Sequence, residues 1–154
     1  MTPKQLVLED FLPYRLSVVS NLVSDAIASA YESLFGLRIP EWRLIAVIAE
    51  NPKGITQQQI GALTRMDKVT VSRAAISLFE RGLLARHPND ADRRSHLLVL
   101  SRSGRELYDA VAPKALELER RIFGQFTAKA LEQFETMLHK VEEIALELHG
   151  PERS

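Results

Sequence analysis

The chain has 154 residues, of which 45% are apolar and 26% are charged, and these proportions are typical of one globular domain. It contains no cysteine, which excludes disulfides, thiolate metal sites and a cysteine nucleophile. The sequence has no apolar run of about 18 residues and no signal-peptide pattern at its start, so we expect a cytoplasmic protein without a membrane span.

Charge is unevenly distributed along the chain, although 20 basic and 20 acidic residues cancel to a formal net charge of zero. The segment 53–105 holds ten Lys and Arg residues against four Asp and Glu residues, a net charge of +6, and the remainder carries −6. A basic face on a neutral or acidic scaffold is typical of nucleic-acid-binding proteins. The middle of the chain is therefore the candidate binding segment.

Two helices are predicted before this segment. Apolar residues recur at helical spacing over 10–35, with Pro13 in the first turn and Gly36 at the end. Pro40 then predicts the start of a second helix that includes residues 41–50.

The next two helices are short and close together. Thr56 is a favourable N-cap for a helix over 57–64, and Asp67 is a favourable N-cap for a helix that ends near Gly82. Two helices joined by a tight turn are the sequence outline of a helix-turn-helix.

A β-hairpin and two long helices complete the predicted order. Strands at 83–87 and 96–100 flank a polar loop at 88–95. We expect the following helix, 102–126, to kink at Pro113, which removes a backbone hydrogen bond. The last helix, predicted over 128–149, carries apolar residues at spacings of three and four, typical of a heptad seam.

The stretches DKVTVSRAAISLFERGLLAR (67–86) and PNDADRRSHLLVLSRSGREL (88–107) follow a known pattern. The pattern of the second stretch begins with Asp, any residue and Arg, and here these are Asp92 and Arg94 on either side of position 93. It continues with an apolar strand, which includes Leu98 and Leu100, and then with Ser or Thr and Gly, which are Ser101 and Gly104. Over nearly its whole length the chain resembles the MarR family of bacterial transcriptional regulators. The resemblance implies a mainly α winged helix-turn-helix fold with a small β-hairpin wing. It also implies one domain over 1–154, with dimerisation helices at about 1–38 and 108–154 and a DNA-binding lobe at about 39–107.

The expected DNA contacts lie on the second helix of the helix-turn-helix, on the helix before it and on the wing. Short polar and basic side chains at the start of a recognition helix can reach base edges in the major groove, and an arginine at a wing tip can enter the minor groove. The candidate DNA-binding residues are Thr56, Gln57, Lys68, Thr70, Ser72, Arg73, Ser77, Arg93, Arg94 and Ser95. The resemblance makes Arg94 the minor-groove arginine and implies that Asp92 supports the wing by pairing with an arginine.

The resemblance further implies a homodimer that binds pseudo-palindromic double-stranded DNA, usually as a repressor. The predicted seam residues are Leu131, Phe134, Leu138, Val141 and Leu148. Family members commonly bind small aromatic or anionic effectors, and this chain resembles those that respond to hydroxycinnamate-type acids or their CoA thioesters. Arg15, among apolar residues, is the candidate carboxylate anchor, with Tyr14 and Trp42 beside it. Pairing of Arg15 with Glu9, Asp10 or Asp25 is the alternative.

Other classes of function fit the sequence less well. His87 and His96 at the base of the wing suggest a metal site, but histidines near phosphate are commoner, and we expect neither metal nor cofactor. A small hydrolytic enzyme is disfavoured because the chain has no HExxH, G-x-S-x-G or Gly-rich phosphate loop. A winged-helix protein-interaction module is disfavoured by Arg73, Arg93 and Arg94.

Overall fold

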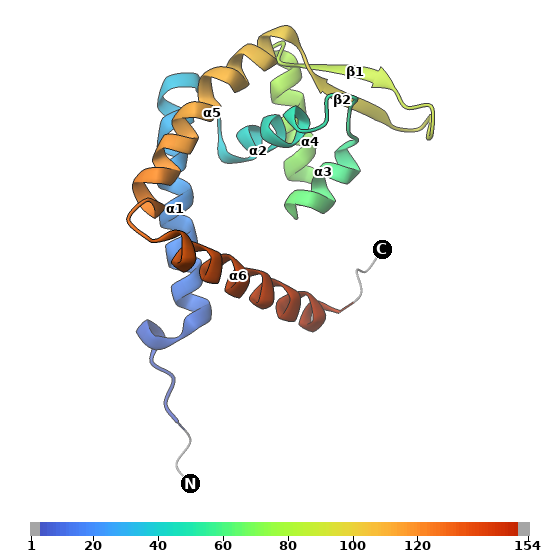
Figure 1. Ribbon diagram of the computed structural model, residues 1–154. Coiled ribbons are helices and arrows are strands. Elements are labelled where there is room, and N and C mark those ends of the chain that lie inside the picture. Colours follow the sequence, from blue (N-terminus) through green and yellow to red (C-terminus); the bar gives the residue numbers. More distant parts are fainter. Residues whose placement is uncertain (1–3, 151–154) are drawn as a thin grey trace. The chain divides into compact units, whose positions relative to one another are not determined.

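The computed structural model describes residues 4–150 and confirms a mainly helical chain with one antiparallel hairpin. After a short 3-10 helix at Leu8–Asp10, the elements are α1 (Leu12–Phe35), α2 (Ile39–Ala49), α3 (Gln57–Thr64), α4 (Lys68–Glu80), β1 (Leu84–Pro88), β2 (His96–Leu100), α5 (Arg102–Phe123) and α6 (Ala128–His149) (Figure 1). The chain divides into two compact units with a boundary between Leu116 and Glu117, and each is described by itself. The single domain over 1–154 stays a prediction.

The helix ends follow local signals in the sequence. Helix α1 starts two residues later than predicted because Leu8–Asp10 forms its own 3-10 turn, and it ends where Gly36 adopts the left-handed conformation with φ 62°. Helix α2 begins at Ile39, one residue before Pro40, whose ring is tolerated in a first turn.

The core of the first unit is formed mainly by α2 and α4, with residues of α3 and β2 packed against them. Leu44, Ile45, Ile60, Leu78 and Leu98 are each at most 1% exposed. The apolar stripe of α4, formed by Val71, Ala74, Ala75 and Leu78, faces this core. Burial of that stripe fixes which side of α4 remains available at the surface.

An aromatic stack joins three helices of the first unit. The Trp42 ring of α2 stacks on Tyr31 of α1, with centroids 5.6 Å apart, and on Tyr108 of α5, with centroids 5.9 Å apart. Tyr31 is 2% exposed, and burial raises the pKa of its hydroxyl. The stack therefore fixes α1 and α5 to α2.

In the antiparallel hairpin, Leu84 pairs with Leu100 at the base and Pro88 pairs with His96 nearest the loop. Strand β1 begins one residue later than predicted, and β2 has the predicted bounds. At the base of the hairpin, the Ser101 hydroxyl donates to the Gly82 carbonyl at 2.6 Å and accepts from the Gly104 amide at 3.0 Å. These bonds hold the start of α5 tightly against the start of β1.

The second unit contains the end of α5 and all of α6. Helix α5 runs through Pro113 and ends at Phe123, three residues before the predicted end. Thr127 caps α6 by accepting from the Ala130 amide at 3.1 Å. Phe123 and Phe134 lie with ring centroids 6.1 Å apart. No residue of α6 is buried, and several of its large apolar side chains are more than 40% exposed.

Among residues 4–150, no helix has the length and apolar character needed to cross a membrane.

Candidate nucleic-acid interface

Helices α3 and α4 are joined by a three-residue turn. Arg65 ends α3 in the left-handed conformation with φ 58°, and Asp67 caps α4 by accepting from the Thr70 amide at 2.7 Å and the Thr70 hydroxyl at 2.9 Å. These two donors, the backbone amide first, hold the pKa of the Asp67 carboxyl below its usual range. The turn and cap confirm the predicted helix-turn-helix.

The polar residues predicted on α4 divide into two groups. Lys68 and Arg73 are exposed, and Ser72 is half-buried. Thr70 and Ser77 lie nearer the flank, and both hydroxyls already have partners within the chain. Ser77 donates to the buried Glu41 carboxylate of α2 at 2.7 Å, and no sequence signal linked these two residues.

Glu41 also holds the start of α2. Its other carboxylate oxygen accepts from the Arg38 amide at 3.0 Å, while Glu41 itself is only 6% exposed. A hollow of about 620 Å³ opens beside this contact between α2 and α4, and three arginines line it, Arg38, Arg73 and Arg81. The flank of α4 is thus strongly basic around one buried acid.

The start of α3 carries the predicted residues Thr56 and Gln57. Thr56 accepts from the Gln59 amide at 3.1 Å, and the Gln59 side chain accepts from the Thr56 amide at 3.0 Å, which closes a capping box. Gln57 lines a hollow of about 440 Å³ between α3 and α4, together with Lys68. The Thr56 hydroxyl therefore has a structural role whether or not it also contacts phosphate.

The wing tip is ordered by its own polar side chains. Asp92 accepts from the Arg94 backbone amide at 3.0 Å, and Ser95 contacts both the Asp92 carbonyl and the Asn89 side chain. The support that Asp92 gives is thus to the backbone of Arg94. This differs from the predicted pairing with an arginine side chain, because the oxygen of a short Asp side chain reaches an amide two residues on more readily than a guanidinium.

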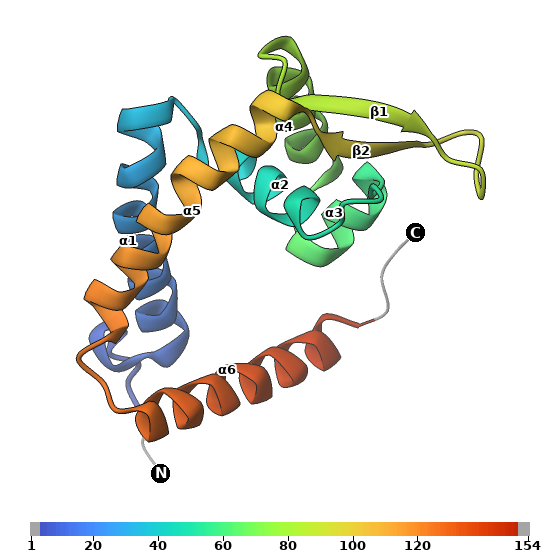
Figure 2. The same ribbon diagram turned by 45° about the horizontal axis from the view of Figure 1, so that its top comes forward.

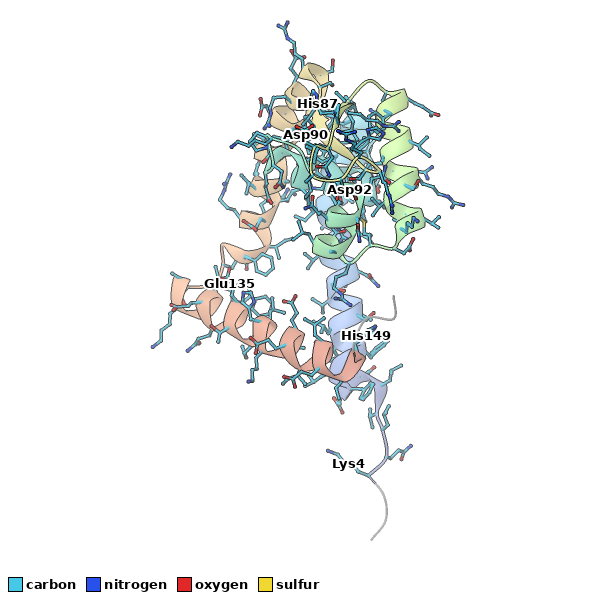
Figure 3. All side chains as sticks on the ribbon, turned by 90° about the vertical axis from the view of Figure 1, so that its right-hand side faces the viewer. Lys4, His87, Asp90, Asp92, Glu135 and His149 are labelled. Carbon is cyan, nitrogen blue, oxygen red and sulfur yellow. The ribbon has the colours of Figure 1, made fainter. Side chains whose placement is uncertain are left out.

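The arginines of the tip point away from this network. Arg93 and Arg94 are both exposed, and within residues 4–150 neither guanidinium makes a hydrogen bond or an ion pair. In Figure 2 the hairpin projects from the group formed by α2, α3 and α4. Figure 3, turned to face the hairpin, labels His87, Asp90 and Asp92 along it. The tip of the hairpin therefore presents two positive charges that have no partner among residues 4–150.

The wing is tied to the helix-turn-helix by one isolated bridge. Ile55, just before α3, exchanges two backbone hydrogen bonds with Leu98 of β2, at 2.8 and 3.2 Å. Gly54 has φ 105° and lies so close to Leu97 that a side chain there would collide with it. The segment just before α3 is therefore part of the wing's support.

The candidate effector residues occupy two separate places. Tyr14 and Arg15 are exposed in the first turns of α1, whereas Trp42 stacks on Tyr31 near the other end of that helix. At 1.5 Å per residue, the 17 residues from Tyr14 to Tyr31 span about 25 Å. Within one chain the structure does not bring these side chains into a common pocket, and their role in effector binding stays a prediction.

The predicted seam of α6 is largely at the surface. Phe134, Leu138, Val141 and Leu148 are 41 to 84% exposed, and Leu131 is half-buried.

The described residues contain no group of three or more His, Asp or Glu side chains arranged to hold a metal ion.

Two exposed residues of α4 were missed by the sequence analysis. Val69 is 57% and Ile76 is 50% exposed, in the middle of the outward face. Their signal was the seven-residue spacing, which puts both on the side opposite the buried stripe.

A supporting helix, a recognition helix and a basic wing in this order define a winged helix-turn-helix protein. Residues 35–95 match the family described as the MarR family. The chain is 25% identical to CouR from Rhodococcus jostii RHA1, crystallised with p-coumaroyl-CoA, with a TM-score of 0.79 over 89% of this chain and 95% of that one. Sco3205 from Streptomyces coelicolor, solved in complex with DNA, is 19% identical to this chain and has a TM-score of 0.80. The similarity covers 92% of this chain and 90% of Sco3205, and it shows that the two proteins share a fold.

Among curated proteins, the chain is 24% identical over 94 residues to the uncharacterized HTH-type transcriptional regulator YybA of Bacillus subtilis, a match that spans 61% of this chain and 62% of that protein. The family match over the helix-turn-helix and wing agrees with the structural similarity over nearly the whole chain. The match to the MarR family thus covers the helix-turn-helix and the wing, residues 35–95, and the solved structures share the fold of nearly the whole chain.

Proposed function

We propose that this regulator binds double-stranded DNA as a homodimer, with α4 in the major groove and Arg94 in the adjacent minor groove. The observation that carries the proposal is the pair of arginines on the wing tip, which have no partner among residues 4–150, together with the exposed Lys68 and Arg73 of α4. A narrow minor groove concentrates negative potential and attracts such arginines. Phosphate contacts by Gln57 and by the amides that open α3 would position the helix.

The dimer is supported by the uncovered apolar residues of α6 and of the first half of α1. On α1, Leu12, Leu16, Val19 and Leu22 are 48 to 77% exposed, which is more apolar surface than a monomer usually leaves in water. A twofold dimer presents two recognition helices to half-sites about 34 Å apart, which matches a pseudo-palindromic operator. Light scattering is expected to give a mass twice the 17.4 kDa of the chain.

The DNA-binding proposal is tested by Arg94→Ala. The substitution is expected to weaken binding to the promoter region beside the protein's own gene by about 5- to 150-fold, which corresponds to about 1–3 kcal/mol. Fluorescence anisotropy with a labelled duplex measures the affinity, and binding by the wild type is expected to fall steeply between about 50 and 200 mM salt.

Arg121→Ala is the matched control, because Arg121 is also exposed but lies near the end of α5. Its affinity is expected to equal that of the wild type. Affinity that is independent of salt would exclude a phosphate-contacting interface, and an undiminished affinity of Arg94→Ala would remove the wing from it.

We further propose that the regulator is a repressor released by an aromatic acid or its CoA thioester. The crystallised complex of CouR with p-coumaroyl-CoA supports this ligand class, as does the exposed Arg15, whose guanidinium suits a carboxylate or phosphate. Because Arg15 and Trp42 lie far apart in one chain, an effector site that uses both residues would have to be completed by the second chain.

Repression is checked by deleting the gene, which is expected to raise transcription from the neighbouring promoter.

p-Coumaroyl-CoA and p-coumaric acid are the two probes for the effector. At least one is expected to lower the affinity for DNA and to change the emission of Trp42, the only tryptophan. Arg15→Ala is expected to need a higher probe concentration for the same release. If neither probe changes the affinity of a protein that binds DNA, the proposed effector class is wrong and the DNA-binding role is unaffected.

A further inference from the structure

The centre of the outward face of α4 is apolar. Val71, Ala74, Ala75 and Leu78 are 0 to 5% exposed and define the buried side, whereas Val69 and Ile76 are 57% and 50% exposed. At about 100° per residue, Val69 and Ile76 lie only about 20° apart around the helix. Both therefore lie opposite the core.

Polar neighbours flank these two residues on the same face. Ser72 and Arg73 lie between them along the helix, on either side of the line that joins them. Thr70 and Ser77 lie about 80–100° around from Val69, where their hydroxyls bond to Asp67 and Glu41. If α4 enters the major groove, Val69 and Ile76 are thus the side chains aimed most directly at the base edges.

An aliphatic side chain in the major groove has one apolar partner. Of the groups that the four bases present there, only the C5-methyl of thymine is apolar, and the others are hydrogen-bond donors or acceptors. Val69 or Ile76 against a polar edge would remove water from that edge without replacing its hydrogen bonds, which is unfavourable. Against a methyl group, the same contact buries apolar surface on both sides.

We propose that Val69 and Ile76 each pack on a thymine methyl group and so select thymine at two positions of each half-site. The inference rests on the proposed DNA-binding function and specifies which bases that function reads. The seven residues from Val69 to Ile76 rise about 10.5 Å along the helix, about three base-pair steps of 3.4 Å. Both contacts fit within one half-site, with Arg73 between them in reach of a guanine edge.

The test begins with a preferred duplex selected from a randomised pool with the wild-type protein. Each thymine of a half-site is then replaced, one at a time, by deoxyuridine, which lacks only the methyl group. The wild type is expected to lose about 3- to 5-fold in affinity at two of these positions, as for one buried methyl group, and little elsewhere. The insensitive thymines serve as internal controls.

Val69→Ala and Ile76→Ala assign the two positions. In each variant one of the sensitive thymines is expected to become indifferent to loss of its methyl group, while the other keeps its effect. Leu34→Ala is the matched control, because Leu34 is a 58% exposed aliphatic residue of α1, and it is expected to leave both effects unchanged. Circular dichroism checks the fold of each variant, and the deoxyuridine series on the wild type does not depend on any substitution.

The outcomes separate this inference from the function on which it rests. The thymine contacts are overturned if binding depends on salt but no thymine loses affinity on replacement by deoxyuridine. They are also overturned if both methyl-dependent thymines keep their effect in both alanine variants. Either result leaves the DNA-binding proposal intact. If the selected duplexes share no recurrent thymine, the thymine contacts are likewise overturned and the DNA-binding proposal stands. Failure to select any duplex whose binding falls with salt overturns both.

Discussion

Gly104→Ala is expected to destabilise the protein by about 3 kcal/mol, the upper end of the usual cost of forcing an extra carbon into a packed site. A methyl group at this buried position would overlap the Leu83 carbonyl oxygen and press on the Leu100 side chain. Neither neighbour can move easily, because the Leu83 carbonyl accepts from the Ser101 amide at 3.0 Å and Leu100 pairs with Leu84 in the hairpin. The start of α5 would have to separate from the wing.

Thermal unfolding followed by circular dichroism measures this loss, and about 3 kcal/mol corresponds to a Tm lowered by roughly 6–12 °C in a chain of this size. Gly61→Ala in α3 is the control. There the new carbon would lie 3.4 Å from the nearest backbone atom, the Met66 carbonyl oxygen, and alanine is the better helix former, so a gain of about 0.5–1 kcal/mol is expected. Equal Tm values for the two variants would refute the packing explanation.

Glu41→Ala is expected to cost about 3 kcal/mol, because Glu41 is buried and joins two helices. The substitution removes the acceptor for the Arg38 amide at the start of α2, a cap contact of about 1 kcal/mol. It also leaves the Ser77 hydroxyl without its partner, at about 1–3 kcal/mol. Both contacts are short, at 3.0 and 2.7 Å.

A double-mutant cycle separates the two contributions. Ser77→Ala alone is expected to cost about 1.5–3 kcal/mol, as for a hydrogen bond to a charged group, and Glu41→Ala and Ser77→Ala together should cost clearly less than the sum of the two. Additive losses from urea unfolding would show that the two side chains do not interact. The DNA affinity of folded Ser77→Ala then reports whether Ser77 also contacts DNA, as the sequence predicts.

The sequence predicted local features of this fold well. The caps formed by Thr56 and Asp67 depend on residues three positions apart, and the hairpin follows from two apolar runs around a polar loop. Such signals are contained in short windows. They placed every helix and strand to within a few residues.

Features that depend on distant residues or on exposure could not be predicted in the same way. Glu41 and Ser77 are 36 residues apart, and nothing near either one indicates the other. Val69 and Ile76 were passed over because polar residues were the expected base readers, although their spacing already places them opposite the buried stripe, and the structure shows that both are exposed. Asp92 accepts from the backbone amide of Arg94, which any residue except proline would supply, so the identity of residue 94 does not indicate this contact.

The backbone bridge between Ile55 and Leu98 has a mechanical consequence. Because the segment before α3 and strand β2 share two hydrogen bonds, the wing cannot swing independently of the helix that supports recognition. A displacement of β2 is therefore expected to move the segment before α3 with it. Hydrogen exchange at the Ile55 and Leu98 amides should accordingly rise and fall together, because opening either bond exposes both strands to solvent.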